Sequence, residues 1–105
     1  MDKSKSDESL ELRGLRESID RIDGALVLLL AERFHITEKV GHYKSEHRLP
    51  AEDSSREAAQ SLRIRELCEQ AGLDYRVASK IFSLILEETK ERHRLIAREY
   101  REYQE

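Results

Sequence analysis

The chain has 105 residues, of which 39% are charged and 38% are hydrophobic, and its formal net charge at pH 7 is −3. This length fits one domain, and the slightly acidic balance argues against a nucleic-acid-binding protein. A single cysteine excludes an internal disulfide, and the apolar runs are too short for a membrane span or a signal peptide, so we expect a cytoplasmic protein that binds no membrane.

The first predicted element is a long amphipathic helix over residues 10–47. Residues 1–9 are polar and charged, and we expect them to form a flexible tail before a single helical domain over residues 10–105. Within the helix, apolar residues recur at alternating steps of three and four, which is the spacing of a heptad seam. The members of this seam are Leu12, Leu15, Ile19, Ile22, Leu26 and Leu29.

Two shorter helices are expected after Pro50, which ends the first helix. Ser54 followed by Glu57 fits a capping box that opens the second helix. Gly72 fits the end of that helix, and Asp74 can cap a third one. Since no segment reads as a strand, the predicted fold class is all-α, with three helices per chain and a long first helix.

The length of the first helix also predicts an intertwined helical dimer. Two shorter helices from the same chain cannot cover its whole apolar seam, and each exposed leucine forgoes roughly 1.5–3 kcal/mol of burial free energy. A second copy of the chain would cover the seam, so we expect an interlocked homodimer. The polar end of the third helix, residues 98–105, is expected to fray.

Two cations interrupt the apolar face of the first helix. Arg33 falls on the seam, and Lys44 lies eleven residues later (44 − 33 = 11), close to three turns at ~3.6 residues per turn. The two cations therefore share a face on which a charge is costly unless an anion pairs with it. The pattern predicts either an anion-binding pocket or an internal ion pair between Arg33 and a glutamate such as Glu87 or Glu88.

Arg16 is a third cation on this helix and lies ~25 Å before Arg33 along the axis. Its side chain cannot reach the Arg33 pocket within one chain. It is therefore either a solvated surface arginine or a residue that acts in the pocket of a partner chain.

Four further polar residues are candidates for a site, and three of them also have an ordinary structural interpretation. Glu57 can serve as a capping residue and Arg56 as a solvated surface residue at the start of the second helix. Thr89 and His93 are four residues apart and share a helix face, although His93 also fits an ordinary exposed histidine. The four histidines and Cys68 show no zinc-ligand spacing, so no metal site is predicted.

Several fragments taken together resemble the helical chorismate mutase family. The stretch LRESIDRIDGALVLLLAERFHITEKVGHYK, residues 15–44, is similar to the first helix of that family. The fragment D-S-S-R-E at 53–57 falls where the family starts its second helix, and F-S-L-I-L-E-E-T at 82–89 falls in its third. The resemblance covers about residues 12–96, and it rests on the order and spacing of these fragments.

The resemblance implies the rearrangement of chorismate to prephenate, without a cofactor. Arg33 and Arg16 of the partner chain would bind the two carboxylates of the dianionic substrate, and Lys44 would donate to its ether oxygen. Glu57, with the backbone amide of Asp53, would hold the ring hydroxyl. Such a reaction needs no nucleophile: the protein selects the reactive conformer and stabilises charge that grows on the ether oxygen.

The same resemblance implies supporting roles for five other residues. Arg56 would support the polar cluster, Thr89 would donate to a carboxylate, and Val40 and Leu86 would form apolar walls. His93 stands where a familiar bacterial member has a glutamine that donates to the ether oxygen, which is a departure from the family pattern. A neutral imidazole still carries one N–H for this purpose.

Three other functions remain open from the sequence. A mutase acting on 4-amino-4-deoxychorismate and an isochorismate-pyruvate lyase resemble this fold and use the same cations. Relatives in those branches tend to carry an apolar residue after the arginine, so the pair Arg56 and Glu57 favours chorismate. The third alternative is a helical interaction module without enzymatic activity.

Overall fold

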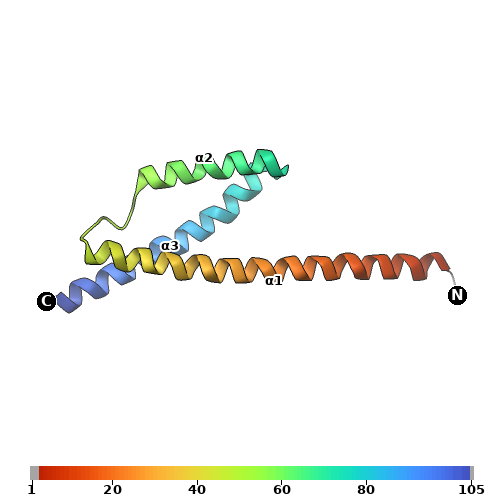
Figure 1. Cartoon of the computed structure of the whole chain (residues 1–105), viewed down its shortest axis with the longest axis horizontal. Helices are drawn as coiled ribbons and strands as arrows, with labels where there is room; N and C mark the ends of the chain where they lie inside the picture. The colour runs from red at the N-terminus through yellow and green to blue at the C-terminus, as the bar shows by residue number, and fades with distance from the viewer. Residues whose placement is uncertain (1–2, 105) are drawn as a thin grey trace. The chain divides into compact units, whose positions relative to one another are not determined.

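The computed structural model describes residues 3–104, and its regular structure is entirely helical (Figure 1). Helix α1 spans Lys3–Glu46, α2 spans Ser54–Ala71 and α3 spans Tyr75–Gln104. The predicted all-α class, with three helices and a long first one, is confirmed. None of these helices, over the residues described, is long and apolar enough to cross a membrane.

The chain divides into two compact units, residues 1–35 and residues 36–105. The first unit holds most of α1. The second holds the end of α1 together with α2 and α3.

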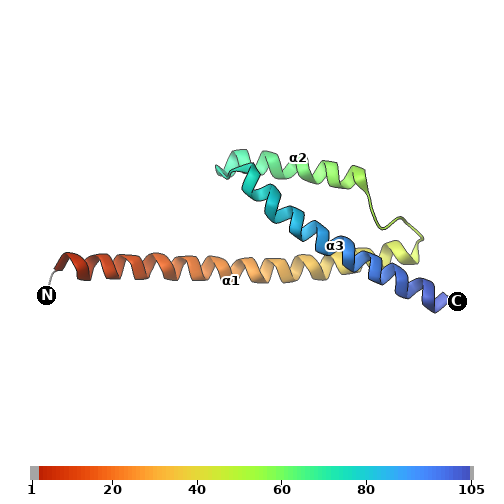
Figure 2. The ribbon, with the colours of Figure 1, turned by 180° about the vertical axis from the view of Figure 1, so that it is seen from behind.

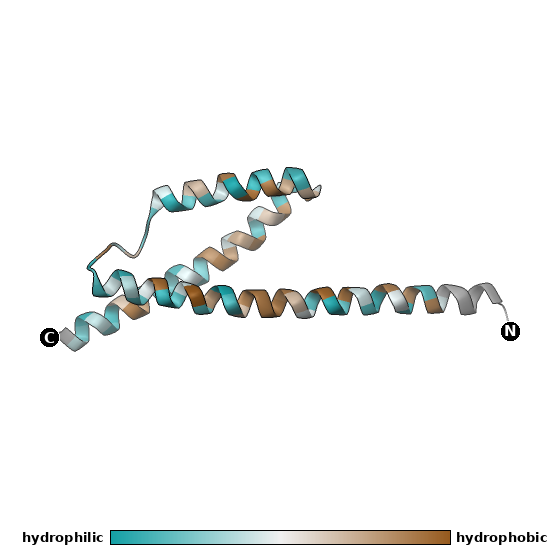
Figure 3. Cartoon of the chain, in the orientation of Figure 1, coloured by the Kyte–Doolittle hydropathy of each residue, from teal (hydrophilic) through white to brown (hydrophobic). Residues whose placement is uncertain are grey.

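In the first unit, α1 begins at Lys3 rather than near residue 10. The segment from 3 to 9 contains neither proline nor glycine, so nothing in it stops the helix from extending toward the N-terminus. A flexible tail over residues 1–9 stays a prediction. The predicted apolar seam lies exposed along this part of α1, from 47% at Leu12 to 66% at Leu29. Figure 3 shows the most apolar stretch of α1 in brown.

In the second unit, α1 ends in a left-handed turn instead of at the proline. Arg48 has a φ of 55°, and the N–H of Leu49 donates to the carbonyl oxygen of Lys44 over 2.8 Å. A hydrogen bond from just beyond a left-handed residue back to the last turn satisfies carbonyls that a helix end leaves open. The last turn of α1, which carries Lys44, is therefore capped before Pro50 is reached.

A tight turn joins α2 to α3, and the two helices lie together near it (Figure 1 and Figure 2). Gly72 caps α2 with a φ of 70°, a conformation that favours glycine, and its N–H donates to the carbonyl oxygen of Cys68. Asp74 then caps α3, because its carboxylate accepts from the N–H of Arg76 over 2.9 Å. Both predicted boundaries are confirmed.

The C-terminal part of α3 contacts the end of α1. The hydroxyl of Tyr100 donates to Glu46 over 3.1 Å and lies 3.3 Å from Nδ1 of His42. The prediction that residues 98–105 fray is wrong as far as residue 104, since α3 continues to Gln104. These polar contacts, made through an aromatic ring, give this segment partners that its charged sequence did not suggest.

Candidate active site

In the second unit, the end of α1 packs against α3 at Gly41. A Cβ atom at this position would lie 2.8 Å from Cδ2 of His93 and 3.0 Å from Cδ1 of Ile96. The side chains of α3 therefore occupy the space that any larger residue would need. Sequence analysis did not single out Gly41, although a glycine inside a helix costs about 1 kcal/mol relative to alanine and so signals a packing requirement.

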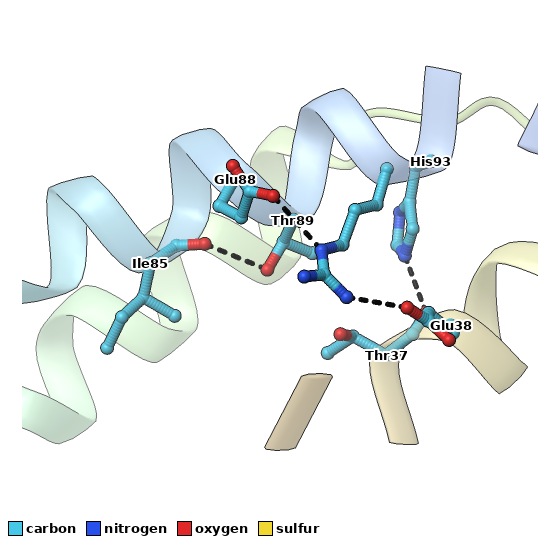
Figure 4. Close-up of polar contacts among 7 residues, drawn as sticks. Thr37, Glu38, Ile85, Glu88, Thr89 and His93 are labelled. Carbon is cyan, nitrogen blue, oxygen red and sulfur yellow. Dashed lines mark hydrogen bonds and ion pairs between the residues drawn. The ribbon is translucent and has the colours of Figure 1, made fainter. Parts of the chain in front are cut away.

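His93 is buried at this contact, with 7% of its surface exposed. Its Nε2 lies 2.7 Å from the backbone oxygen of Thr37 (Figure 4). A carbonyl oxygen can only accept, so Nε2 carries the hydrogen, and a neutral ring then has no hydrogen on Nδ1. The predicted role of His93 as a donor to substrate stays a prediction, and it now requires Nδ1 of a protonated ring or a shift of the side chain.

Thr89 lies on the same face of α3 and is also buried, at 9% exposed. Its hydroxyl donates to the carbonyl oxygen of Ile85 over 2.9 Å, as Figure 4 shows. This bond to the preceding turn is common for threonine in helices. The hydroxyl must rotate away from Ile85 before it can donate to a carboxylate.

Lys44 lies half-buried in the last turn of α1. Its Nζ donates to the carbonyl oxygen of Ala51 over 3.2 Å, which ties α1 to the loop before α2. An ammonium group has three N–H donors, so two remain for another acceptor.

Asp53 caps the start of α2, and the predicted capping box of Ser54 and Glu57 is wrong. The Asp53 carboxylate accepts from the N–H of Arg56 over 3.1 Å and from the hydroxyl of Ser55 over 3.3 Å. The hydrogen bond from Arg56 is the main cause that lowers the pKa of Asp53 from 3.8. Since the cap lies one residue earlier than predicted, the side chain of Glu57 is not used for capping.

Glu57 instead forms an ion pair with Lys90 of α3, with Nζ and Oε1 2.9 Å apart. This hydrogen bond to Glu57 is the main cause that raises the pKa of Lys90 from 10.5. Glu57 and Leu86 also line a small cleft of about 80 Å³ between α2 and α3.

The remaining predicted site residues lie on α1 and at the start of α2. Arg56 is exposed in the first turn of α2, and Val40 is 41% exposed on α1. Arg16 and Arg33 lie on the part of α1 that belongs to the first unit. Lys44, Asp53, Glu57, Thr89 and His93 all lie in the second unit, and the catalytic and binding roles of these residues, like those of Arg16 and Arg33, stay predictions.

The type II chorismate mutase family model matches residues 15–94. The chain belongs to this family. All of the candidate site residues, from Arg16 in the first unit to His93 in the second, lie within this match.

Two curated relatives are similar to the chain, and one of them is named for the activity of the family. The chain is 34% identical over 80 residues to a protein of Methanocaldococcus jannaschii named chorismate mutase, a match that covers 76% of this chain and 81% of the relative. It is 33% identical over 79 residues to the T-protein of Enterobacter agglomerans, a match that covers 75% of this chain. The chain spans only 21% of the T-protein.

Two residues of this family member escaped the sequence analysis besides Gly41. Lys90 directly follows Thr89, but nothing in the sequence showed that Glu57 would face it. Arg92 joins α3 to α1 through Glu38 at 2.6 Å and also binds Glu88 at 3.1 Å (Figure 4). The four-residue spacing from Glu88 to Arg92 was a usable signal. It gives Glu88 a partner other than the Arg33 that sequence analysis considered.

No three histidine, cysteine, aspartate or glutamate side chains among residues 3–104 are grouped closely enough to hold a metal ion.

Proposed function

We propose that the chain is a chorismate mutase, an isomerase that converts chorismate to prephenate in aromatic amino-acid biosynthesis, and that it works in the cytoplasm. Membership of the type II family over residues 15–94 supports the reaction class. The observation that carries the proposal is that Lys44, Glu57 and His93, one from each of the three helices, all lie in one compact unit.

Lys44 is the proposed donor to the ether oxygen. Negative charge grows on this oxygen as the carbon–oxygen bond breaks, and a fixed cation stabilises the transition state more than the substrate. The bond from Nζ to Ala51 holds the ammonium group in place and leaves two donors. Arg33 and the partner chain's copy of Arg16 would anchor the two carboxylates and so select the compact conformer.

Glu57 and the amide of Asp53 are proposed to hold the ring hydroxyl, with Arg56 supporting the cluster. Asp53 is fixed by its role as the α2 cap, which places its own amide at the start of the helix. Helix N-termini present N–H groups that suit electron-rich oxygen atoms. Thr89 and His93 would complete the polar side of the pocket, and Val40 and Leu86 its apolar walls.

We further propose that the protein is a homodimer in which Arg16 acts in trans. The support is the exposed apolar seam of α1, on which Ile19 and Ile22 are 54% and 59% exposed in the single chain. Apolar surface on this scale is rarely left in water. Sedimentation should find a dimer at micromolar concentration, and a folded monomer there would contradict this part of the proposal.

The reaction is tested by offering the purified protein chorismate, isochorismate and 4-amino-4-deoxychorismate separately and identifying the products. Prephenate from chorismate, with little or no turnover of the other two compounds, is the expected result. Preferential turnover of the amino compound or release of pyruvate from isochorismate would instead assign the chain to one of the other two activities. If none of the three compounds is turned over, the remaining alternative is a helical interaction module without enzymatic activity.

A further inference from the structure

Lys90 places a cation next to Glu57, the residue that is proposed to hold the ring hydroxyl. Its Nζ lies 2.9 Å from Oε1 of Glu57, and the two side chains are 32% and 35% exposed. Lys90 is also the neighbour of Thr89 in α3 and lies one turn before His93. The ion pair therefore joins α2 to α3 through two partly buried side chains, one of which is the residue proposed to contact the ring hydroxyl.

Two other charged groups act on Lys90. The carboxylate of Glu52 adds to the attraction, whereas the guanidinium of Arg94 opposes it. Arg94 itself lies 3.5 Å from Glu52, and these two charges act on Lys90 in opposite directions. Glu57 is left as the dominant partner, and the main cause that raises the pKa of Lys90 is its hydrogen bond to this residue.

We infer that Lys90 is a specificity-determining residue, which makes the pocket prefer a neutral hydroxyl over an ammonium group at ring position C4. The inference rests on the proposed function, since it concerns the substituent that Glu57 would contact. Lys90 would discriminate between chorismate and its 4-amino analogue by charge, because the two molecules differ only in the substituent at C4.

The physical reason lies in the net charge that the substituent meets. A lone carboxylate attracts an ammonium group more strongly than a hydroxyl, so Glu57 alone would favour the amino compound. With Lys90 paired to it, the local charge is close to zero. A carboxylate has about four lone-pair positions, so Glu57 can still accept from a hydroxyl while it binds Lys90. An aliphatic amine, which is positive at neutral pH, would meet the like charge of Lys90.

A purely structural role for the pair is the competing explanation, because the bridge also ties α2 to α3. Loss of such a tie would reduce the amount of folded protein and would lower the turnover of both substrates alike. The ratio of kcat/KM for chorismate to kcat/KM for the amino compound, measured in one preparation, does not depend on the folded fraction. This ratio therefore separates the two explanations.

The experiment compares Lys90→Met, Lys90→Gln and Lys90→Arg with the parent protein. In both neutral variants, the ratio should fall roughly tenfold, which corresponds to about 1.4 kcal/mol of lost discrimination. Lys90→Arg keeps the charge and should keep the ratio. Lys80→Met, which removes an exposed lysine from the same helix, is the matched control and should leave the ratio unchanged. In a Glu57→Gln background, Lys90→Met should change the ratio much less, because the two residues act together.

The outcomes separate this inference from the proposed function. If the parent converts chorismate and the neutral variants keep its ratio, Lys90 does not set specificity and only this inference is overturned. If the parent converts the amino compound more readily than chorismate, both are overturned. A similar fall in the Lys80→Met control would mean that net charge alone changes the ratio, which also overturns the role of Lys90.

Discussion

Nε2 of His93 on α3 donates to the backbone carbonyl of Thr37 on α1, over a distance of 2.7 Å. This bond uses the one hydrogen that a neutral imidazole carries. The buried ring therefore links α3 to α1, and a catalytic role has to use its other nitrogen or a displaced ring.

Replacement of His93 distinguishes the structural role from the catalytic one. His93→Ala should lose roughly 10²-fold in turnover per folded molecule if the ring donates to the ether oxygen. His93→Gln should keep much of the activity, because its amide can donate from a similar distance.

Stability measurements are the control for that series. Both variants lose the imidazole bond to Thr37, and the free energy of unfolding of the alanine variant should fall by about 1–3 kcal/mol, because it loses this bond together with the packing of the ring against Gly41. If the alanine variant melts early but turns over as fast as the parent per folded molecule, His93 serves packing only.

Gly41→Ala should destabilise the protein even though alanine is the better helix former. The new Cβ would approach Cδ2 of His93 to 2.8 Å and Cδ1 of Ile96 to 3.0 Å. Overpacking of this kind typically costs about 1–3 kcal/mol, more than the ~1 kcal/mol gained in helix propensity. Gly24→Ala is the matched control, since a Cβ there meets no atom within 4 Å and should not destabilise. Urea unfolding of both variants checks the prediction, and equal stabilities would contradict it.

Asp53 should make folding stability depend on pH in the acid range. Its pKa is lowered in the folded protein from 3.8, mainly by the N–H of Arg56. A carboxyl group of this kind adds stability above its unfolded pKa and loses it as the pH falls through its folded pKa. Asp53→Asn keeps a capping oxygen without the charge. The difference in unfolding free energy between parent and variant should be constant from neutral pH to about pH 5 and shrink toward about pH 2. A difference that stays constant over the whole range would refute the assignment.

Complementation tests whether Arg16 acts in trans. Arg16→Ala and Lys44→Ala proteins, each inactive alone, should regain activity when they are refolded together. One of the two pockets in a heterodimer would then contain both native residues. Refolded homodimers of each variant are the controls, and verified heterodimers without activity would contradict the trans assignment.

The sequence predicted the helices well because their boundaries depend on local chemistry. Gly72 and Asp74 end and start helices through bonds to their own neighbours in the chain, which spacing and residue type reveal. The cap of α2 was predicted at Ser54 instead of Asp53, because Ser54 and Glu57 match a capping-box pattern that begins one residue later.

The contacts of the site were less accessible to sequence analysis. The pairing of Lys90 with Glu57 depends on how α2 lies against α3, and no local pattern encodes that arrangement. The bond from His93 to Thr37 likewise depends on the close approach that Gly41 permits. The family resemblance predicted the residue set, and the geometry shows which of its donors already make hydrogen bonds within the chain.

Tyr100 ties the far end of α3 to the last turn of α1, which carries the proposed donor Lys44. Its hydroxyl binds Glu46 in the last turn of α1, two residues after Lys44, and it lies two turns after His93 in one continuous helix. A truncation or a bulky fusion at this end would weaken the hydrogen bond from Tyr100 to Glu46. The last turn of α1, which positions the Lys44 ammonium group, would then be held less firmly. Recombinant versions for kinetic work are therefore best engineered at the other terminus.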